Sequence, residues 1–320
     1  MSVNNIIREA DYNSIRNKLA NIIGVGSGDS GWGQTLVSSA VSVGNRVSIN
    51  EWGRLRFDII NAWTHIYGSA PTTVQVVEGN TIRSSVVDAP YTTYDTIVNT
   101  IVANKFVVHS SQASLDSVAS SSTAWPGPYG TSWKTRIQCT VTVSWPTANA
   151  ARHFFNSGGQ IRLSSAQSGG NGSQQVSAWR TLLTNAGTQQ FGGNNPGTGI
   201  SPNNGQNWYR LTNSYQQWYT ISGSTPYGAN NYRILARCNV ANNSTGTASS
   251  AEFLVEFNDN YIDPDVAAGR PELFNPPGDN VDGTFAVSAS SLYATGILVP
   301  LGTGSFAVTR PTIQVGVVSP

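Results

Sequence analysis

Apolar side chains recur at helical spacing near the start of the chain. Four of them fall on one face of a helix with a period of about 3.6 residues: Ile15, Leu19, Ile22 and Ile23. Asp11 precedes this stripe as a good N-cap, and Gly24 follows it where helices usually stop. The pattern predicts a first helix over 11–23.

A second helix is marked by a capping box and a longer apolar stripe. Ser48 and Glu51 have the spacing at which each side chain bonds the other's backbone N–H. The stripe runs on until Gly68 and comprises Trp52, Leu55, Ile59, Ala62, Trp63 and Ile66. We expect four of these residues to form the core of a helical domain: Trp52, Leu55, Ile59 and Trp63.

Two further helices are predicted from weaker patterns. One begins near Thr93, and its inward positions are Tyr94, Ile97, Val98, Ile101 and Val102. The other covers 147–156 and interrupts a region that otherwise favours strands. The three helices that come first in the chain are enough to close a small core.

Beyond Trp125 the apolar period changes from helical to two, which is typical of half-buried strands. Residues 136–145 alternate cleanly, and the alternation returns in segments 232–240, 253–257, 285–287 and 306–318. Turn-forming runs rich in Gly, Asn and Pro separate these segments. Short alternating strands between such turns favour an antiparallel sandwich, jelly roll or barrel.

The change of period predicts three parts in the chain and an α+β class that is mainly β. Residues 1–108 form a small helical domain, and residues 109–124 have the small polar side chains of a linker. Residues 125–320 form an antiparallel β-sandwich or jelly-roll-like domain. No internal repeat is visible.

Charge is scarce in this chain and excludes two classes of partner. Only 11% of the 320 residues are charged, where an ordinary soluble domain carries roughly 25%. The net charge of +1 and pI near 7.8 provide no field that would steer the chain onto nucleic acid or an anionic membrane. No apolar run reaches the roughly 18 residues of a membrane helix, and the N-terminal residues lack a signal-peptide pattern.

The cysteine content predicts no disulfide. Cys139 and Cys238 each alternate with apolar residues at a period of two, which places both on buried strand faces. We expect both thiols to be reduced and structural.

A glycine-rich stretch over 24–34 resembles a phosphate-binding loop in composition only. Such a loop follows a strand, precedes a helix and carries a Lys-Ser/Thr pair. Here a helix precedes it, an extended segment follows, and Trp32 stands where lysine is needed. We interpret it as a flexible inter-helix loop, with four candidates for contact with a neighbouring subunit: Gly26, Gly28, Gly31 and Trp32.

The three histidines show no sequence motif of a metal site or a catalytic site. None of His65, His109 and His153 has a second His or Cys at metal-ligand spacing. We expect His65 to pack or face solvent, and His153 to form a structural hydrogen bond. A Ser–His–Asp arrangement stays open in so serine-rich a chain, although no nucleophile-elbow sequence marks one. The chain is therefore predicted to be non-enzymatic and to use no cofactor or metal.

Five aspartates form the nearest approach to a carboxylate cluster: Asp259, Asp263, Asp265, Asp279 and Asp282. Their neighbours suit turns better than a calcium loop, whose alternating ligands and final Glu are missing. A polysaccharide depolymerase would instead need two of these carboxylates facing each other across a cleft.

An aromatic-dense stretch has three interpretations. It contains Trp208, Tyr209, Tyr215, Trp218 and Tyr219. Exposed rings beside Asn and Gln suit stacking on sugars, and Tyr and Trp are also enriched at subunit interfaces. Filling of the β-domain core is the favoured interpretation.

Several segments resemble virion structural proteins of tailed phages, especially contractile-tailed phages of cyanobacteria. At the N-terminus the resemblance is carried by Asp11-Tyr12-Asn13, Ile15-Arg16-Asn17-Lys18, the 24–34 loop and Asn61-Ala62-Trp63-Thr64-His65. A second segment, 153–162 followed by Ser168-Gly169-Gly170, is similar to a recurrent stretch in such proteins. The resemblance implies a place in the tail, baseplate or neck, often as a tail-fibre-like protein, and brings no catalytic residues.

These observations lead to one expectation and two alternatives. We expect a virion component, assembled in the host cytoplasm, whose helical domain docks on other virion proteins and whose copies form a ring or trimer. Scarce charge lowers the cost of burying wide surfaces between copies. The alternatives are a carbohydrate-binding module that recognises a host surface glycan, and a capsid decoration protein.

Overall fold

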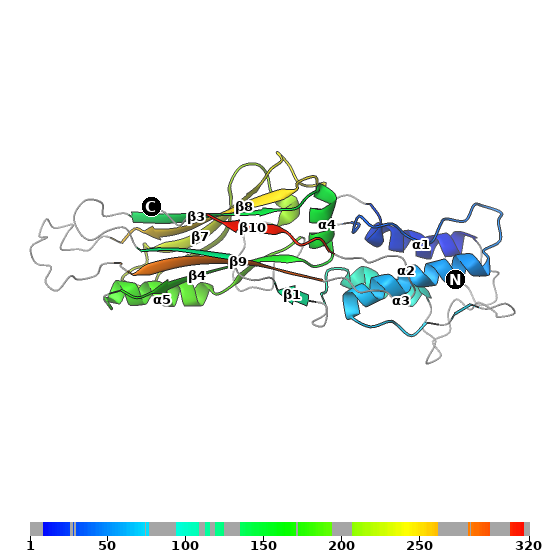
Figure 1. Cartoon of the computed structure of the whole chain (residues 1–320), viewed down its shortest axis with the longest axis horizontal. Helices are drawn as coiled ribbons and strands as arrows, with labels where there is room; N and C mark the ends of the chain where they lie inside the picture. Colours follow the sequence, from blue (N-terminus) through cyan, green and yellow to red (C-terminus); the bar gives the residue numbers. More distant parts are fainter. Residues whose placement is uncertain are drawn as a thin grey trace, which may run out of the picture. The chain divides into compact units, whose positions relative to one another are not determined.

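The computed structural model describes residues 9–25, 28, 30–73, 75–76, 94–108, 113–115, 119–124, 135–170, 172–193, 207–261, 281, 283–294 and 308–316. Five α-helices and two antiparallel sheets lie within this part, so the fold is mixed α+β with substantial sheet (Figure 1). The chain divides into two compact units. Unit 1 comprises Met1–Leu115, Thr147–Gly159 and Leu292–Arg310, and unit 2 comprises Asp116–Pro146, Gln160–Ser291 and Pro311–Pro320.

Three helices from the first hundred residues build the core of unit 1: α1 (Glu9–Ile23), α2 (Ile49–Tyr67) and α3 (Tyr94–Asn104). The expectation that Asp11 caps α1 is wrong, because Asp11 lies inside the first turn beside Glu9. Acidic side chains in the first turn interact favourably with the positive end of the helix dipole, but they do not occupy the N-cap position. The helix ends before Gly24, whose N–H donates to Ala20 O at 2.9 Å.

Both predicted ends of α2 are confirmed. Glu51 N–H donates to Ser48 Oγ at 3.5 Å, and Ser48 N–H donates to the Glu51 carboxylate. Gly68 ends the helix with a φ of 79°, a left-handed conformation that glycine adopts without strain. Local sequence therefore sets both boundaries of this helix.

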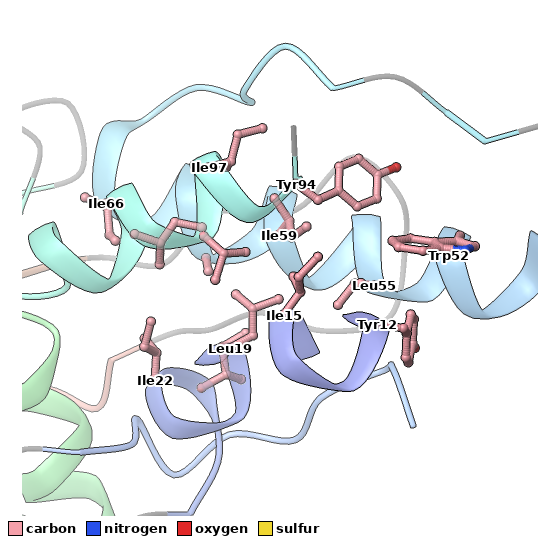
Figure 2. Close-up of a cluster of buried hydrophobic side chains, with 14 of the residues drawn as sticks. Tyr12, Ile15, Leu19, Ile22, Trp52, Leu55, Ile59, Ile66, Tyr94 and Ile97 are labelled. Atoms are coloured by element: carbon pink, nitrogen blue, oxygen red, sulfur yellow. The ribbon is translucent and has the colours of Figure 1, made fainter. Parts of the chain in front are cut away.

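Figure 2 shows the apolar side chains of the three helices meeting in one cluster. The predicted core residues Trp52, Leu55 and Ile59 are buried there. Trp63 is only half-buried, at the margin, with its ring 4.3 Å from that of Tyr67. The prediction that Val102 faces inward is wrong, since 41% of it is exposed.

A fourth helix joins unit 1 from the middle of the chain. The predicted helix over 147–156 is present as α4 (Ala148–Asn156), and the Thr147 side chain caps it by accepting from Ala150 N–H at 3.1 Å. Although strands flank it in the sequence, α4 belongs to the same compact unit as α1, α2 and α3. A period-based division of the chain does not detect this insertion.

Two five-stranded sheets contain the remaining elements. One sheet has the order β1-β9-β4-β5 with β2 also pairing β9, and it is built from β1 (Ala113–Leu115), β2 (Ala119–Ala124), β4 (Gln160–Ser168), β5 (Gln189–Phe191) and β9 (Thr284–Ala294). The other has the order β10-β3-β8-β7-β6, from β3 (Thr135–Ser144), β6 (Gln216–Ser222), β7 (Asn231–Cys238), β8 (Ser250–Asp259) and β10 (Thr312–Val315). Residues 113–115 and 119–124 were expected in a linker but form β1 and β2.

The predicted alternation is confirmed in the long central strands. Along β7 every second residue is buried, and β3 and β8 pair over ten residues each with Ile137, Val141 and Phe253 inward. Cys139 and Cys238 are free and buried, as predicted, and burial raises the pKa of the Cys139 thiol to about 11. Neither thiol is poised for reaction.

Side chains of the two sheets meet in a common aromatic core within unit 2. Phe257 of β8 lies 5.0 Å from Phe285 of β9, and Phe191 of β5 lies 5.2 Å from Trp218 of β6, between ring centroids. Trp179 of α5 (Gln174–Ala186) adds a ring 5.5 Å from Phe285. Figure 1 shows α5 alongside β4. Helix α5 is absent from the elements that the sequence patterns predict.

Within the described ranges, no helix combines the length and the apolarity needed to cross a membrane.

Candidate functional site

Residues 24–34 are here called the glycine loop, of which the structure describes 24, 25, 28 and 30–34, and residues 32–34 fold back onto the end of α1. Trp32 N–H donates to Ile22 O at 2.6 Å, Gly33 N–H to Gly24 O at 3.0 Å and Gln34 N–H to Ile23 O at 2.7 Å. Gly28 and Gly31 have φ values of 57° and 86°, which only glycine adopts readily. Backbone hydrogen bonds therefore fix residues 32–34 of the loop against the end of α1.

Residues of helix α4 hold this loop by hydrogen bonds to its backbone and to Trp32. Asn156 Nδ2 donates to Gly31 O at 2.8 Å and to Gly28 O at 3.2 Å, and Trp32 Nε1 donates to Asn156 O at 2.9 Å. Arg152 adds a hydrogen bond to Ser30 O at 2.7 Å. We call these contacts the α4 clamp. They correct the prediction of a flexible loop, because the partners lie more than 120 positions away along the chain.

Trp32 and two histidines form a buried aromatic group behind the α4 clamp. The Trp32 ring centroid lies 4.5 Å from that of His65 on α2 and 6.3 Å from that of His153 on α4. The two imidazoles are 5.9 Å apart, with planes inclined by 26°. All three side chains are almost completely buried, so the proposed contact residue Trp32 lies inside the chain.

The imidazoles sit in an environment that opposes their charge. Burial lowers the pKa of His65 to about 4, and burial together with the neighbouring His65 lowers the pKa of His153 to about 3. Neither ring nitrogen of His65 has a hydrogen-bond partner, nor has His153 Nε2. His153 Nδ1 lies 3.1 Å from Gln34 Nε2, which fits the predicted structural hydrogen bond.

His109 and Gly26 lie outside the described residues. Among the residues that are described, no three His, Cys, Asp or Glu side chains are placed to hold a metal ion together.

An extended segment after the glycine loop is fixed to the helices by side chains. The Asp58 carboxylate on α2 accepts from Val37 N–H at 3.0 Å, Ser38 N–H at 2.8 Å and Ser38 Oγ at 2.6 Å. Asn13 on α1 bonds both backbone groups of Val41, at 2.7 and 3.0 Å. Burial raises the pKa of Asp58, and the hydrogen bonds from Ser38 and Val37 oppose that rise.

Apolar side chains remain exposed along the same stretch of chain. Val43 is 90% exposed and Val25 is 73% exposed, while Val37 and Ile49 are more than two-fifths exposed. Four of the six exposed large apolar residues found in the described part thus lie between 25 and 49; the other two are Val102 and Val107. The backbone carrying Val25, Val37 and Val43 is held by the glycine-loop bonds and by Asp58 and Asn13.

The aromatic stretch is mostly internal. Trp208, Tyr209, Trp218 and Tyr219 are buried, so these rings are not accessible for stacking on a sugar. Tyr215 is half-buried, its hydroxyl bonds the Glu252 carboxylate, and its ring lies 4.5 Å from the Arg237 guanidinium carbon. This placement matches the interpretation that these residues fill the core.

One aspartate of the predicted turn cluster can be placed. Asp259 ends β8 and accepts a hydrogen bond from Gln175 Nε2 at 2.7 Å, so it is not in a surface turn. Burial raises its pKa to about 7, against the opposing hydrogen bonds from Tyr261, Asn230 and Gln175. The other four predicted turn residues lie outside the described part: Asp263, Asp265, Asp279 and Asp282.

Sequence reasoning missed the residues that hold the loop and the extended segment. Asn156, Arg152, Asn13 and Asp58 all bond backbone groups far away in the sequence. The one local signal is Asp58, a charged residue between apolar positions of α2, where an unpaired carboxylate would be costly.

Comparison of the chain with models of protein families, with curated proteins and with solved structures finds no match.

Proposed function

We propose that this chain is a non-enzymatic structural protein of a tailed-phage virion, associated with the tail as a baseplate, neck or fibre component. Copies would assemble with one another, as a ring or trimer, and with other virion proteins. Unit 1 would make the docking contact, and unit 2 would present a β-sandwich formed by the two sheets. The shared aromatic core of Phe257, Phe285 and Phe191 supports the sandwich arrangement.

The exposed valines on a fixed backbone carry this proposal. Exposed apolar side chains are a marker of protein contacts when they gather in one region. A contact surface that is already ordered before binding loses less entropy on association. Val25, Val37 and Val43 lie in one stretch of chain next to fixed backbone. Val37 N–H donates to Asp58 of α2, Val43 follows Val41, which Asn13 of α1 bonds, and Val25 follows Gly24, whose carbonyl accepts from Gly33 N–H.

The reactive side chains of unit 1 also support a structural role. His65, His153 and Asp58 are buried and lie against Trp32, Gln34 and Ser38 of the same unit. A general acid or base must reach the proton that it transfers. Groups enclosed in this way serve folding better than catalysis.

Replacement of the exposed valines tests the docking surface. The triple variant Val25→Asp/Val37→Asp/Val43→Asp should leave the fold intact but weaken self-assembly or incorporation into particles at least tenfold, because three charges would have to be buried at the contact. Light scattering after size exclusion gives the oligomeric state, and quantitative immunoblotting of purified particles gives incorporation.

The control is Val102→Asp/Val107→Asp, which changes two exposed valines outside residues 25–49, with exposed fractions of 41% and 43%, close to that of Val37. Normal assembly of the triple variant would remove residues 25–49 as the docking surface. Cryo-electron microscopy or immunogold labelling of intact particles tests the position itself. Labelling on the capsid surface would replace the tail assignment with a decoration role, and absence from particles would refute a virion function.

A further inference from the structure

The glycine loop packs against a pair of buried imidazoles, three of whose four ring nitrogens lack a hydrogen-bond partner among the described residues. Trp32, the anchor of the loop, packs on His65 and His153 and donates to Asn156 of α4. We propose that the His65–His153 pair makes the α4 clamp acid-labile, so that mild acid releases the glycine loop from α4 while the three-helix core stays folded.

The protonated form of either imidazole would lack hydrogen-bond acceptors in this environment. A protonated imidazole carries two N–H donors and needs an acceptor for each. Both nitrogens of His65 and Nε2 of His153 face no acceptor, and His153 Nδ1 already faces the Gln34 side-chain amide. Two imidazolium ions 5.9 Å apart would also repel each other in a poorly screened interior.

The charged groups on the surrounding elements do not neutralise the pair. On α4 the neighbouring charge is the Arg152 cation, which is directed to Ser30 O and Asn149 Oδ1. On α2 the buried charge is Asp58, seven positions before His65, and its oxygens accept from Val37 and Ser38. Neither group is hydrogen-bonded to an imidazole, and the described residues of the glycine loop contain no titratable side chain.

Proton binding therefore favours the open state of the α4 clamp. Exposed imidazoles have a pKa near 6.5, whereas burial lowers it to about 4 for His65 and about 3 for His153. Above pH 7 both imidazoles are neutral in the closed and in the open state, so a change of pH does not shift the equilibrium between the two states. As the pH falls below 6.5 only the open state takes up protons, so at pH 5 each histidine favours opening by about 30-fold.

The core of unit 1 lies on other residues of α2. Trp52, Leu55 and Ile59 pack against Tyr12, Ile15 and Ile97, as Figure 2 shows. These contacts contain no imidazole, so they hold α1, α2 and α3 together after the loop leaves α4. The effect is a property of the isolated chain and does not depend on the proposed virion role.

Hydrogen exchange measured by mass spectrometry on the full chain tests this inference. Between pH 7.5 and pH 5, after correction for intrinsic exchange, protection of segments 24–34 and 147–159 should fall at least 30-fold. Protection of α1 and of strand β7 should change less than threefold. The variant His65→Gln/His153→Asn, which cannot take up the protons and keeps an acceptor for Gln34, should lose the pH dependence.

Equal pH dependence in the wild type and the double variant would overturn the proposal, as would unchanged protection of both segments at pH 5. A second measurement uses the wild type alone and so does not require the double variant to fold: nuclear magnetic resonance of the histidine ring protons as a function of pH. Both imidazoles should stay neutral until the loop loses protection. Titration of either ring near pH 6.5 with the loop still protected would contradict the mechanism.

Discussion

Asp58 and Asn13 order a piece of backbone that belongs to no helix or sheet. Backbone N–H groups that are buried must find acceptors, and here side chains of α1 and α2 supply them for Val37, Ser38 and Val41. Asn156 acts on the glycine loop from both ends of its hydrogen-bonding capacity: its side-chain amide donates to the Gly28 and Gly31 carbonyls, and its backbone carbonyl accepts from Trp32 Nε1. Single polar residues therefore shape the surface that we propose as a docking site.

Replacement of Asp58 should show how much its hydrogen bonds to Val37 and Ser38 contribute to the free energy of unfolding. In Asp58→Asn one acceptor oxygen becomes an NH2 donor that faces N–H or O–H groups, and we expect a loss of about 2 kcal/mol in the free energy of unfolding of unit 1. Urea denaturation followed by hydrogen exchange of α2 gives this value. Ser38→Ala, which removes only one of the three donors, should cost about half as much. Equal stability of Asp58→Asn and wild type would show that the extended segment does not need the carboxylate.

At the scale of elements, local sequence predicted some helices and strands well and others not at all. The capping box and Gly68 set the ends of α2, and the alternation of β3 and β7 set the direction of their side chains. Helix α5 was missed although Ser173 caps it, Val176, Trp179 and Leu183 follow at helical spacing, and Gly187 ends it. Apart from Arg180, its polar residues are the uncharged Gln, Ser, Thr and Asn that also fill the neighbouring turns, and this similarity hid the helical period.

Gly53 and Gly44 of unit 1 both have open space for a methyl group but differ in backbone conformation, so alanine at each position should affect stability in opposite directions. Gly53 lies within α2, and a methyl group there would meet nothing within 4 Å. We expect Gly53→Ala to raise the free energy of unfolding by about 1 kcal/mol, because alanine loses less backbone entropy in a helix. Thermal melting followed by circular dichroism gives the change.

Gly44 is the matched control for that substitution. It has equal space but a φ of 84°, so Gly44→Ala should lower stability by about 1 kcal/mol through backbone strain. If both variants shifted the melting temperature in the same direction, backbone conformation would not be the cause.

At the scale of the whole molecule, the pKa shifts of three buried groups predict opposite responses of the two units to pH. In unit 1, the lowered pKa values of His65 and His153 mean that stability is complete above pH 6.5 and declines as the pH falls. In unit 2, the pKa of Asp259 is raised to about 7 from its usual 3.8, so its contribution is complete near pH 4 and is lost as the pH rises through 7.

Urea denaturation at pH 5 and pH 7.5, with hydrogen exchange as the probe of each unit, should therefore give opposite shifts. From pH 7.5 to pH 5 the midpoint for α2 should decrease and that for β8 should increase. Asp259→Asn should abolish the shift of β8 and leave that of α2 unchanged. Parallel shifts of the two midpoints would show that other groups dominate.

Local physical chemistry was enough to predict the helical start of the chain, the strand-rich remainder and the burial of Cys139 and Cys238. Periods and caps report which side of an element is apolar and where it ends, because those properties depend on neighbouring residues alone. They do not report which distant segment covers that side. Only tertiary packing placed α4 with the first three helices, brought Trp32 against His65 and His153, and buried Trp208 and Trp218. These features depend on contacts across 100 or more positions, or on what shields a face from water, and neither is encoded in a local pattern.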